Sequence, residues 1–270
     1  MNSGRRVSLC PSSPSVRCPV LPGARQKGET PVDSWFDMAR AVPSGWPRTY
    51  CFAHAGGRAQ AFVGWQEALA GVTALVAVTP PERIGIETVC DQIAERIAAH
   101  RTGPFLLFGH SLGALIAFEV ARRLGDRPAH LIASGCVAPA LHPTPRMVEV
   151  AGLDGQSLTE AVALYGGMRP EIVADPELQE FILPDVRADF RMVAEYRYHP
   201  AAALPFGISL VNGVDDPMVR RDDLAGWSRE CVVEPEMHWS EGGHFYFEQH
   251  PEAVTDVIRR AAEALPVELI

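Results

Sequence analysis

The sequence lacks the long apolar segments, paired cysteines and lysines that mark several common classes of protein. No run of about 18 apolar residues occurs, so nothing is expected to span or bind a membrane. The six cysteines include no C-x-x-C pair, which argues against a metal site or disulfide framework and favours a reducing cytoplasm. Lys27 is the single lysine, and the net charge of −9 argues against nucleic acid as a partner. The 270 residues, 47% hydrophobic, instead fit one sizeable domain.

The first 46 residues lack any hydrophobic period and are rich in proline, serine, glycine and arginine. They contain no uninterrupted apolar stretch of the kind that a secretory signal needs. We therefore expect residues 1–46 to be a disordered tail, or upstream sequence included by a misplaced start. Residues 34–39, with the sequence SWFDMA, are a candidate segment for docking onto the folded domain.

The most informative segment is an apolar run, a Gly-His-Ser-Leu-Gly motif and a helix-compatible stretch in direct succession. Residues 105–108 suit one buried strand, and residues 112–124 are apolar on nearly every face. A G-x-S-x-G motif between a strand and a helix is typical of a nucleophile elbow, whose helix N-terminus directs N–H groups at a developing negative charge. The motif predicts Ser111 as nucleophile and Leu112 as an oxyanion donor. His110 is expected to line the substrate site and shape the elbow rather than carry protons.

A glycine-rich loop follows an early strand, predicted at residues 49–53. In G-x-S-x-G enzymes a loop at this place supplies the second N–H group of the oxyanion hole, and we assign that role to Ala55. His54, Gly56 and Gly57 are expected to line the substrate site. We expect the His54 side chain to be hydrogen-bonded to backbone rather than to react.

Strands and helices alternate over most of the chain, which predicts an α/β fold with a mostly parallel, doubly wound sheet. Further strands are expected at residues 72–78, 130–134, 206–212 and 231–237, with helices at 62–69, 87–100, 224–228 and 251–265. Only helices are expected between residues 140 and 204, at 157–165 and 176–196. We therefore divide the domain into an α/β core, residues 47–139 and 205–270, and a helical lid, residues 140–204. An apolar lid implies a substrate with an apolar part.

The late part of the chain offers an acid and a histidine in the order known for α/β-hydrolases, which is serine, acid, histidine. His244 follows two glycines, and histidine is the side chain whose ordinary pKa suits a general base near neutrality. A carboxylate must orient its ring and stabilise its charged form. Either Asp215 or Asp216 can do so, and Asp216 is favoured because Pro217 beside it makes the turn rigid.

Four motifs in this order resemble those of type II thioesterases, stand-alone α/β-hydrolases that accompany polyketide synthases and non-ribosomal peptide synthetases. They are Phe-Ala-His-Ala-Gly-Gly at 52–57, Gly-His-Ser-Leu-Gly-Ala at 109–114, Gly-x-x-Asp-Pro-x-Val at 213–219 with Trp227 after it, and Gly-Gly-His-Phe at 242–245. The resemblance covers about residues 48–265. It extends to Asp185-Val-Arg-Ala-Asp189 in the family's lid.

The resemblance implies an α/β-hydrolase fold and hydrolysis of acyl groups from the phosphopantetheine arm of an acyl or peptidyl carrier protein, for editing or release. It assigns Ser111, Asp216 and His244 to a catalytic triad that needs no metal or other cofactor. The oxyanion hole falls to Ala55 and Leu112. The chain departs from the family at 80–83, where Pro-Pro-Glu-Arg replaces the usual Pro-Gly-Arg, and this change is expected to affect the pocket or its lid contact.

Other functions fit part of this pattern. An esterase or lipase acting on free small esters or acyl-CoA would carry the same elbow. Acyltransferases share Gly-His-Ser-Leu-Gly but lack the late Gly-Gly-His loop, and a non-catalytic acyl-binding protein on this scaffold would not need every triad residue. For carrier docking, Arg122-Arg123 and Arg220-Arg221 are candidate basic pairs, although such pairs are more often only a solvated surface.

Overall fold

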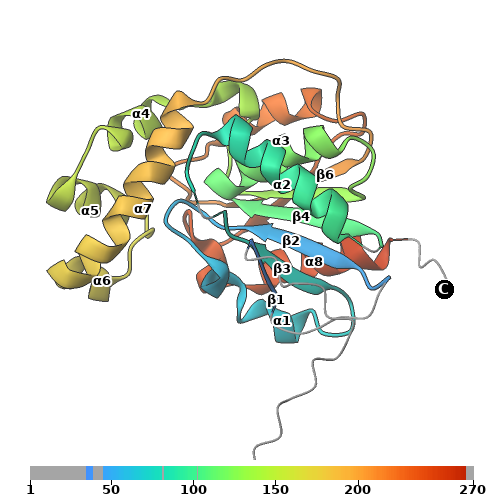
Figure 1. Ribbon diagram of the computed structural model, residues 1–270, viewed down its shortest axis with the longest axis horizontal. Helices are drawn as coiled ribbons and strands as arrows, with labels where there is room; N and C mark the ends of the chain where they lie inside the picture. Colours follow the sequence, from blue (N-terminus) through green and yellow to red (C-terminus); the bar gives the residue numbers. More distant parts are fainter. Residues whose placement is uncertain (1–34, 39–44, 81, 102, 266–270) are drawn as a thin grey trace, which may run out of the picture. The chain divides into compact units, whose positions relative to one another are not determined.

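The computed structural model describes residues 35–38, 45–80, 82–101 and 103–265. Seven strands form one sheet in the order β1-β3-β2-β4-β5-β6-β7 (Figure 1). They are β1 Phe36–Met38, β2 Arg48–Phe52, β3 Ala74–Val78, β4 Phe105–His110, β5 His130–Ser134, β6 Gly207–Gly213 and β7 Glu236–Ser240. Neighbouring strands are parallel except for β1 and β3, which confirms the mostly parallel sheet predicted from the alternation of elements.

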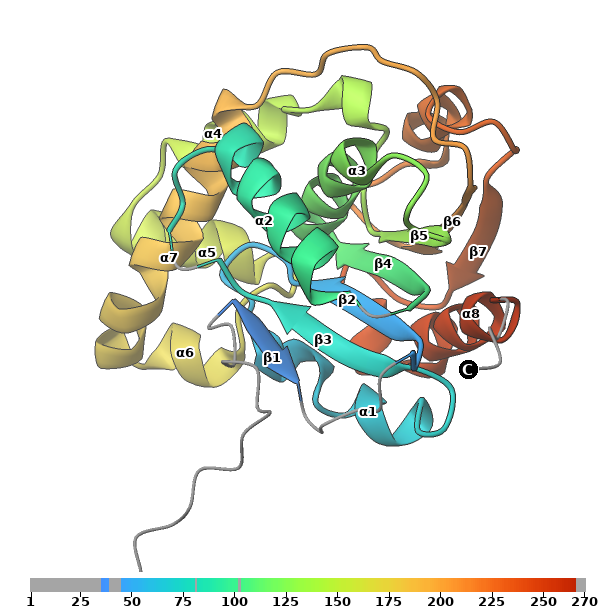
Figure 2. The ribbon, with the colours of Figure 1, turned by 45° about the vertical axis from the view of Figure 1, so that its right-hand side comes forward.

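Helices cover both faces of the sheet (Figure 2). The helices α2 (Ile86–His100) and α3 (Leu112–Leu124) pack on one face, and α1 (Trp65–Ala68) and α8 (Glu252–Glu263) on the other. The described residues also form four 3-10 helices: η1 Ala59–Phe62, η2 Pro139–Leu141, η3 Arg221–Arg229 and η4 Tyr246–Glu248. In the described part of the chain, no helix has both the length and the apolar character that a membrane crossing requires.

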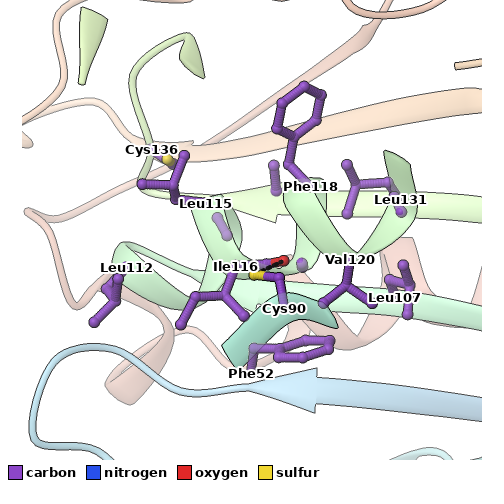
Figure 3. Close-up of a cluster of buried hydrophobic side chains, with 14 of the residues drawn as sticks. Phe52, Cys90, Leu107, Leu112, Leu115, Ile116, Phe118, Val120, Leu131 and Cys136 are labelled. Atoms are coloured by element: carbon purple, nitrogen blue, oxygen red, sulfur yellow. Dashed lines mark hydrogen bonds between the residues drawn. The ribbon is translucent and has the colours of Figure 1, made fainter. Parts of the chain in front are cut away.

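The central elements are buried on all sides, which explains their continuous apolar sequences. All six residues of β4 are buried, as expected for a strand covered on both faces. Figure 3 shows Leu115 and Phe118 of α3 in one buried cluster with Cys90 of α2 and Leu107 of β4. Fully burying each such side chain contributes about 1.5–3 kcal/mol. The helix that begins after Ser111 is therefore held firmly in the core.

The segment between β5 and β6 is helical, as the sequence predicted. It contains α4 (Pro145–Ala151), α5 (Gly155–Ala163), α6 (Pro170–Ala174) and α7 (Pro176–Glu195), which group together at one side of the view in Figure 1. These helices have a small apolar cluster of their own: Val150, Leu158, Ala161, Val162, Met168 and Val186. We call residues 140–204 the lid. The sequence analysis predicted α5 and α7 but missed α4 and α6, which are short and begin at prolines.

The last strand does not lie where the sequence predicted it. We expected it at residues 231–237, whereas β7 is Glu236–Ser240. Val232 and Val233 are 64% and 57% exposed, and Cys231 makes a single bridge with Leu204. The apolar run that suggested a strand is therefore largely a surface loop, and the more polar segment after it forms the edge of the sheet.

Strand β1 falls within the expected N-terminal tail. Phe36–Met38 pairs with β3, and Trp35 and Phe36 are buried against the core, so these residues belong to the sheet and not to a tail. This is the docking for which residues 34–39 were a candidate. Apart from residues 45 and 46, the rest of the segment 1–46 lies outside the described residues.

Candidate active site

Ser111 occupies a sharp turn between β4 and α3. Its φ of 57° and ψ of −120° make it the single non-glycine residue with positive φ in the described part of the chain. Such a strained conformation persists only where the surroundings fix it. A Cβ atom at Gly109 would lie 2.1 Å from the Gly113 carbonyl oxygen, and one at Gly113 would lie 2.1 Å from the Phe52 carbonyl oxygen. Glycine at both positions therefore lets strand, helix and the end of β2 meet as a nucleophile elbow requires.

His244 and Asp216 form a buried pair. The His244 Nδ1 atom lies 2.8 Å from Asp216 Oδ2, with side-chain exposures of 6% and 0%. The other carboxylate oxygen of Asp216 accepts a hydrogen bond from the Met218 N–H at 2.7 Å, which fixes the carboxylate plane. Asp215 is exposed, and its backbone N–H donates to the Gly242 carbonyl. Of the two aspartates left open by the sequence, Asp216 is the one in contact with the histidine.

One pocket brings together residues that are far apart in the sequence. Ser111, His244, Ala55, Leu112 and His54 all line it. Within the described residues, the backbone N–H groups of Ala55 and Leu112 have no hydrogen-bond acceptor, so both remain available to a bound group. The lid contributes a largely apolar wall: Met147, Val162, Tyr165, Phe190 and Val193. The arrangement thus places a hydroxyl, an imidazole and two free donors beside an apolar cavity.

His110 is buried and is not among the residues that line this pocket, so its contact with substrate stays a prediction. Its Nδ1 atom is 2.9 Å from the Ser134 hydroxyl, which lies 2.7 Å from the Tyr246 hydroxyl. Its ring centroid is 4.8 Å from that of His244. Burial, with a smaller contribution from His244, holds the pKa of His110 well below its usual range. A ring that stays neutral supports the neighbouring imidazole by packing, in keeping with the predicted role in shaping the elbow.

His54 differs from its prediction in how its side chain is held. Within the described residues its ring has no hydrogen bond, and it stands edge-on to Phe245 with centroids 4.8 Å apart. Its backbone carbonyl, rather than its side chain, holds the loop by accepting from the Gly57 N–H at 2.8 Å. Burial, with a smaller contribution from His244, lowers the pKa of His54 to about 4. The ring is therefore a neutral wall of the pocket.

The remaining loop residues lead to contacts that the sequence analysis missed. Gly56 and Gly57 are not among the residues that line the Ser111 pocket, and Gly57 lines a neighbouring hollow, so their contact with substrate stays a prediction. The Gly56 N–H instead donates to Asp189 of the lid at 2.8 Å, and Asp189 also accepts from Arg83 Nε at 2.9 Å. The spacing of Asp185 and Asp189 on one helix face was the signal available in the sequence.

A larger cleft of about 660 Å³ lies elsewhere, between the end of α3 and residues 196–205. Its charged groups satisfy one another. Glu119 pairs with Arg122 at 2.9 Å and with Arg123 at 2.7 Å, and it accepts from the Tyr196 hydroxyl at 2.8 Å. None of the predicted catalytic residues lines it. Size alone therefore does not identify the site, whereas the chemistry of the Ser111 pocket does.

Comparison with known proteins agrees with this geometry. The family model of the thioesterase domain matches residues 47–262. The chain belongs to the thioesterase family. The thioesterase PikA5 of Streptomyces venezuelae is 32% identical to it over 243 residues, 84% of this chain and 85% of that protein. The probable cadicidin biosynthesis thioesterase of Streptomyces griseus is 28% identical over 296 residues, 96% of this chain and 81% of that protein.

Among solved structures, this thioesterase resembles the type II thioesterase BorB from the borrelidin biosynthetic cluster. The TM-score is 0.78 at 30% identity, with 87% of this chain and 100% of that chain covered. The α/β-hydrolase fold and the resemblance to type II thioesterases are thereby confirmed. This thioesterase is a serine hydrolase that acts on thioester bonds.

Proposed function

We propose that the protein is a stand-alone type II thioesterase that removes acyl groups from the phosphopantetheine arm of an acyl or peptidyl carrier protein in polyketide or non-ribosomal peptide synthesis. The observation that carries the proposal is the buried His244–Asp216 pair, which opens with Ser111 onto one pocket in a chain of the thioesterase family. The four cysteines within the described residues are free and buried, which is compatible with work in a reducing cytoplasm.

The first half of the reaction is acylation of the enzyme. The Ser111 hydroxyl oxygen forms a bond to the thioester carbonyl carbon while His244 accepts the hydroxyl proton. The carbonyl oxygen becomes negative and is held by the N–H groups of Ala55 and Leu112, each such donor lowering the barrier by about 3 kcal/mol. The C–S bond then breaks, and His244 returns the proton to the departing phosphopantetheine sulfur.

The second half is hydrolysis of the acyl-enzyme. His244 removes a proton from water, whose oxygen attacks the acyl carbon and releases the acid as Ser111 recovers its proton. In both halves the imidazole gains a positive charge that Asp216 stabilises across 2.8 Å. The hydrogen bond from the Met218 N–H keeps that carboxylate oriented. The cycle uses these side chains, two backbone donors and water.

The pocket favours an acyl group that is apolar next to its carbonyl. The lid residues facing Ser111 are mostly aliphatic or aromatic, and the free volume between them and the serine is about 50 Å³. At about 30 Å³ for each water molecule in the liquid, that space holds roughly two, so we expect a short acyl group to fit best while the lid is in place. A longer chain requires the lid to move outward.

The two basic pairs considered for carrier docking differ in the structure. Arg122 and Arg123 are largely buried in ion pairs with Glu119, so we remove them from the docking surface. Arg220 is 80% exposed and pairs with Asp223, while Arg221 stacks on Trp239 with its guanidinium 3.9 Å from the ring centroid. Arg220 borders a groove that shares Tyr165 and Met218 with the Ser111 pocket, which makes it the better candidate for contact with an acidic carrier.

Intact-mass analysis with a panel of acylated carrier proteins tests the proposal. The wild-type protein should remove acyl groups from the carriers, and Ser111→Ala should fold normally but neither release nor accept them. A fluorophosphonate probe should label the wild type alone. Faster turnover of simple esters than of carrier-bound thioesters would favour an esterase, and absence of both labelling and turnover would favour an acyl-binding protein.

A further inference from the structure

The lid helix α7 makes a polar contact with the loop that carries one of the two proposed oxyanion donors. Asp189, 6% exposed, accepts the Gly56 N–H with one carboxylate oxygen at 2.8 Å and Arg83 Nε with the other at 2.9 Å. One helical turn earlier, Asp185 pairs with Arg58 and lies 3.5 Å from Arg83. Because a buried carboxylate needs such partners, Asp189 can occupy this place only when the loop is beside it.

The backbone of the loop is fitted closely to the same helix. Gly56 has a φ of 75°, and a Cβ atom there would lie 2.5 Å from Val186 Cγ2. Glycine thus serves two purposes, since it permits the left-handed backbone and leaves space for the valine. The loop therefore contacts α7 at two neighbouring positions on one helix face. Val186 makes the apolar contact, and Asp189 makes the polar contact through its carboxylate.

The two oxyanion donors consequently have different supports. Leu112 is the first residue of α3, whose position is set by the buried core. The Gly56 N–H that Asp189 accepts belongs to the peptide unit directly after the one that carries the Ala55 N–H, so the lid restrains the direction of that donor from the adjacent unit. Displacing one reacting group by about 1 Å can lower a rate by 10²-fold, so the support of such a donor matters for catalysis.

We propose that Asp189 is a positioning residue, through which the seated lid helix, together with Arg83, holds the Ala55 N–H in the oxyanion hole. Seating of α7 then completes the catalytic site, and movement of the lid to admit a long acyl chain loosens one donor until the helix returns. The proposal rests on the proposed function. It also gives a role to Arg83, the last residue of the altered 80–83 segment, which contacts the lid and does not line the Ser111 pocket.

The test separates stabilisation of the oxyanion from ordinary substrate binding. A short acyl thioester of N-acetylcysteamine serves as substrate, because it does not depend on carrier docking. Two inhibitors carry the same chain. One is a trifluoromethyl ketone, which Ser111 attacks to form an adduct with a negatively charged oxygen, and the other is a thioether with CH₂ in place of the carbonyl. Only the ketone depends on the oxyanion hole.

Asp189→Ala should lower kcat roughly 10- to 100-fold with KM nearly unchanged, since part of one oxyanion donor is lost. Affinity for the ketone should fall by a similar factor, and affinity for the thioether should stay within about threefold. Asp189→Asn, which keeps an acceptor for the Gly56 N–H but loses the charge facing Arg83, should lie between wild type and Asp189→Ala. The matched control is Asp154→Asn, a lid carboxylate that pairs with Arg187 of α7 at 3.7 Å and not with the loop, and its constants should remain near wild type.

Three results would overturn the inference while leaving the proposed function intact. They are Asp189 variants that behave like Asp154→Asn, an effect confined to KM, and equal losses of ketone and thioether affinity, which would indicate a wall of the pocket. If Asp189→Ala fails to fold by circular dichroism, Asp189→Asn and Arg83→Gln decide in its place. A wild-type protein that hydrolyses no thioester would instead refute the proposed function.

Discussion

The core and the lid of this thioesterase differ in the size of the side chains that they bury. The largest fully buried side chains, among them Trp227, Tyr50 and Tyr246, all belong to the core. The lid buries only small and medium apolar side chains in its own cluster, and it leaves Phe181 82% and Leu164 72% exposed. Polar contacts join it to the core at several places, among them Tyr196 to Glu119 at 2.8 Å and the contacts of Asp185 and Asp189.

In this enzyme the core carries the predicted catalytic residues, whereas the lid forms the apolar wall of the pocket beside them. Ser111, Asp216 and His244 lie in the core, whereas the lid buries few large side chains, so we expect the lid to open locally without displacing them. Because this wall comes from the lid, we expect the lid to select which acyl groups enter. Four predictions test this division of roles, in decreasing order of expected effect.

The largest effect is expected from the core acid. Asp216→Asn should lower kcat by about 10⁴-fold, because an amide that faces His244 favours the wrong tautomer and cannot stabilise the imidazolium. Steady-state hydrolysis of an acyl thioester measures this loss. The neighbouring Asp215→Asn, exposed and away from the histidine, is the control and should keep near wild-type turnover. A loss in the control, or none in Asp216→Asn, would reassign the acid.

A cavity made in the core and a matching cavity made in the lid should destabilise different parts of the protein. Leu115 in α3 and Leu158 in α5 are both 0% exposed, and Leu→Ala at such sites removes about 2–5 kcal/mol. We expect Leu115→Ala to lower the melting temperature of the whole domain, whereas Leu158→Ala should chiefly accelerate amide exchange in residues 145–195. Thermal melts and hydrogen exchange measure both effects. Equal melting shifts with no local exchange would mean that core and lid unfold as one unit.

The junction of the two regions should respond to acid. Burial lowers the pKa of His142 to about 4, whereas an unfolded histidine titrates near 6.5. The unfolded state therefore binds more protons between these values. The stability due to neutral His142 is complete above pH 6.5 and is lost as the pH falls towards 4, by roughly 3 kcal/mol at most.

His142→Gln should weaken this dependence without abolishing it, because His54 and His110 also have lowered pKa values. Denaturant unfolding at pH 7 and pH 4.5 gives the free energy of unfolding for both proteins. The wild type should lose more stability between the two conditions than the variant does. Identical losses would show that His142 titrates normally in the folded state.

Short sequence motifs predicted the parts of the site that are formed by a few consecutive residues. The elbow was predictable because a strand, two glycines and a helix N-terminus occupy consecutive residues around Ser111. The sequence favoured Asp216 over Asp215 but could not decide between them, because both residues lie in one turn. Only the folded structure shows that Asp216 is the buried one. The last strand was misplaced because Val232 and Val233 look like strand residues but face outward.

Contacts between distant segments were beyond the reach of such patterns. The bond from Ser134 to Tyr246 joins residues 112 positions apart, and the one from Gly56 to Asp189 joins residues 133 apart. In neither pair does the sequence around one residue indicate which distant residue is its partner. Buried polar groups must find partners, but the sequence does not say which. The order of strands and helices was therefore predictable from the sequence. The hydrogen bonds that hold His110 and the loop at Gly56 could be found only in the structure.

The smallest effect is expected on the outer surface of the lid. Phe181 of α7 is 82% exposed, so Phe181→Ser should change the free energy of unfolding by less than about 0.5 kcal/mol and leave kcat/KM for a short acyl thioester unchanged. Phe190, on the same helix, lines the Ser111 pocket and provides the contrast. Phe190→Ser should lower kcat/KM for apolar acyl groups, more as the chain lengthens, because the lost apolar wall no longer contacts the substrate. Competition assays with acyl thioesters of two lengths measure both variants. If Phe181→Ser changed chain-length preference as strongly as Phe190→Ser, the outer face of the lid would have to contact substrate, and the lid could not be a one-sided cover.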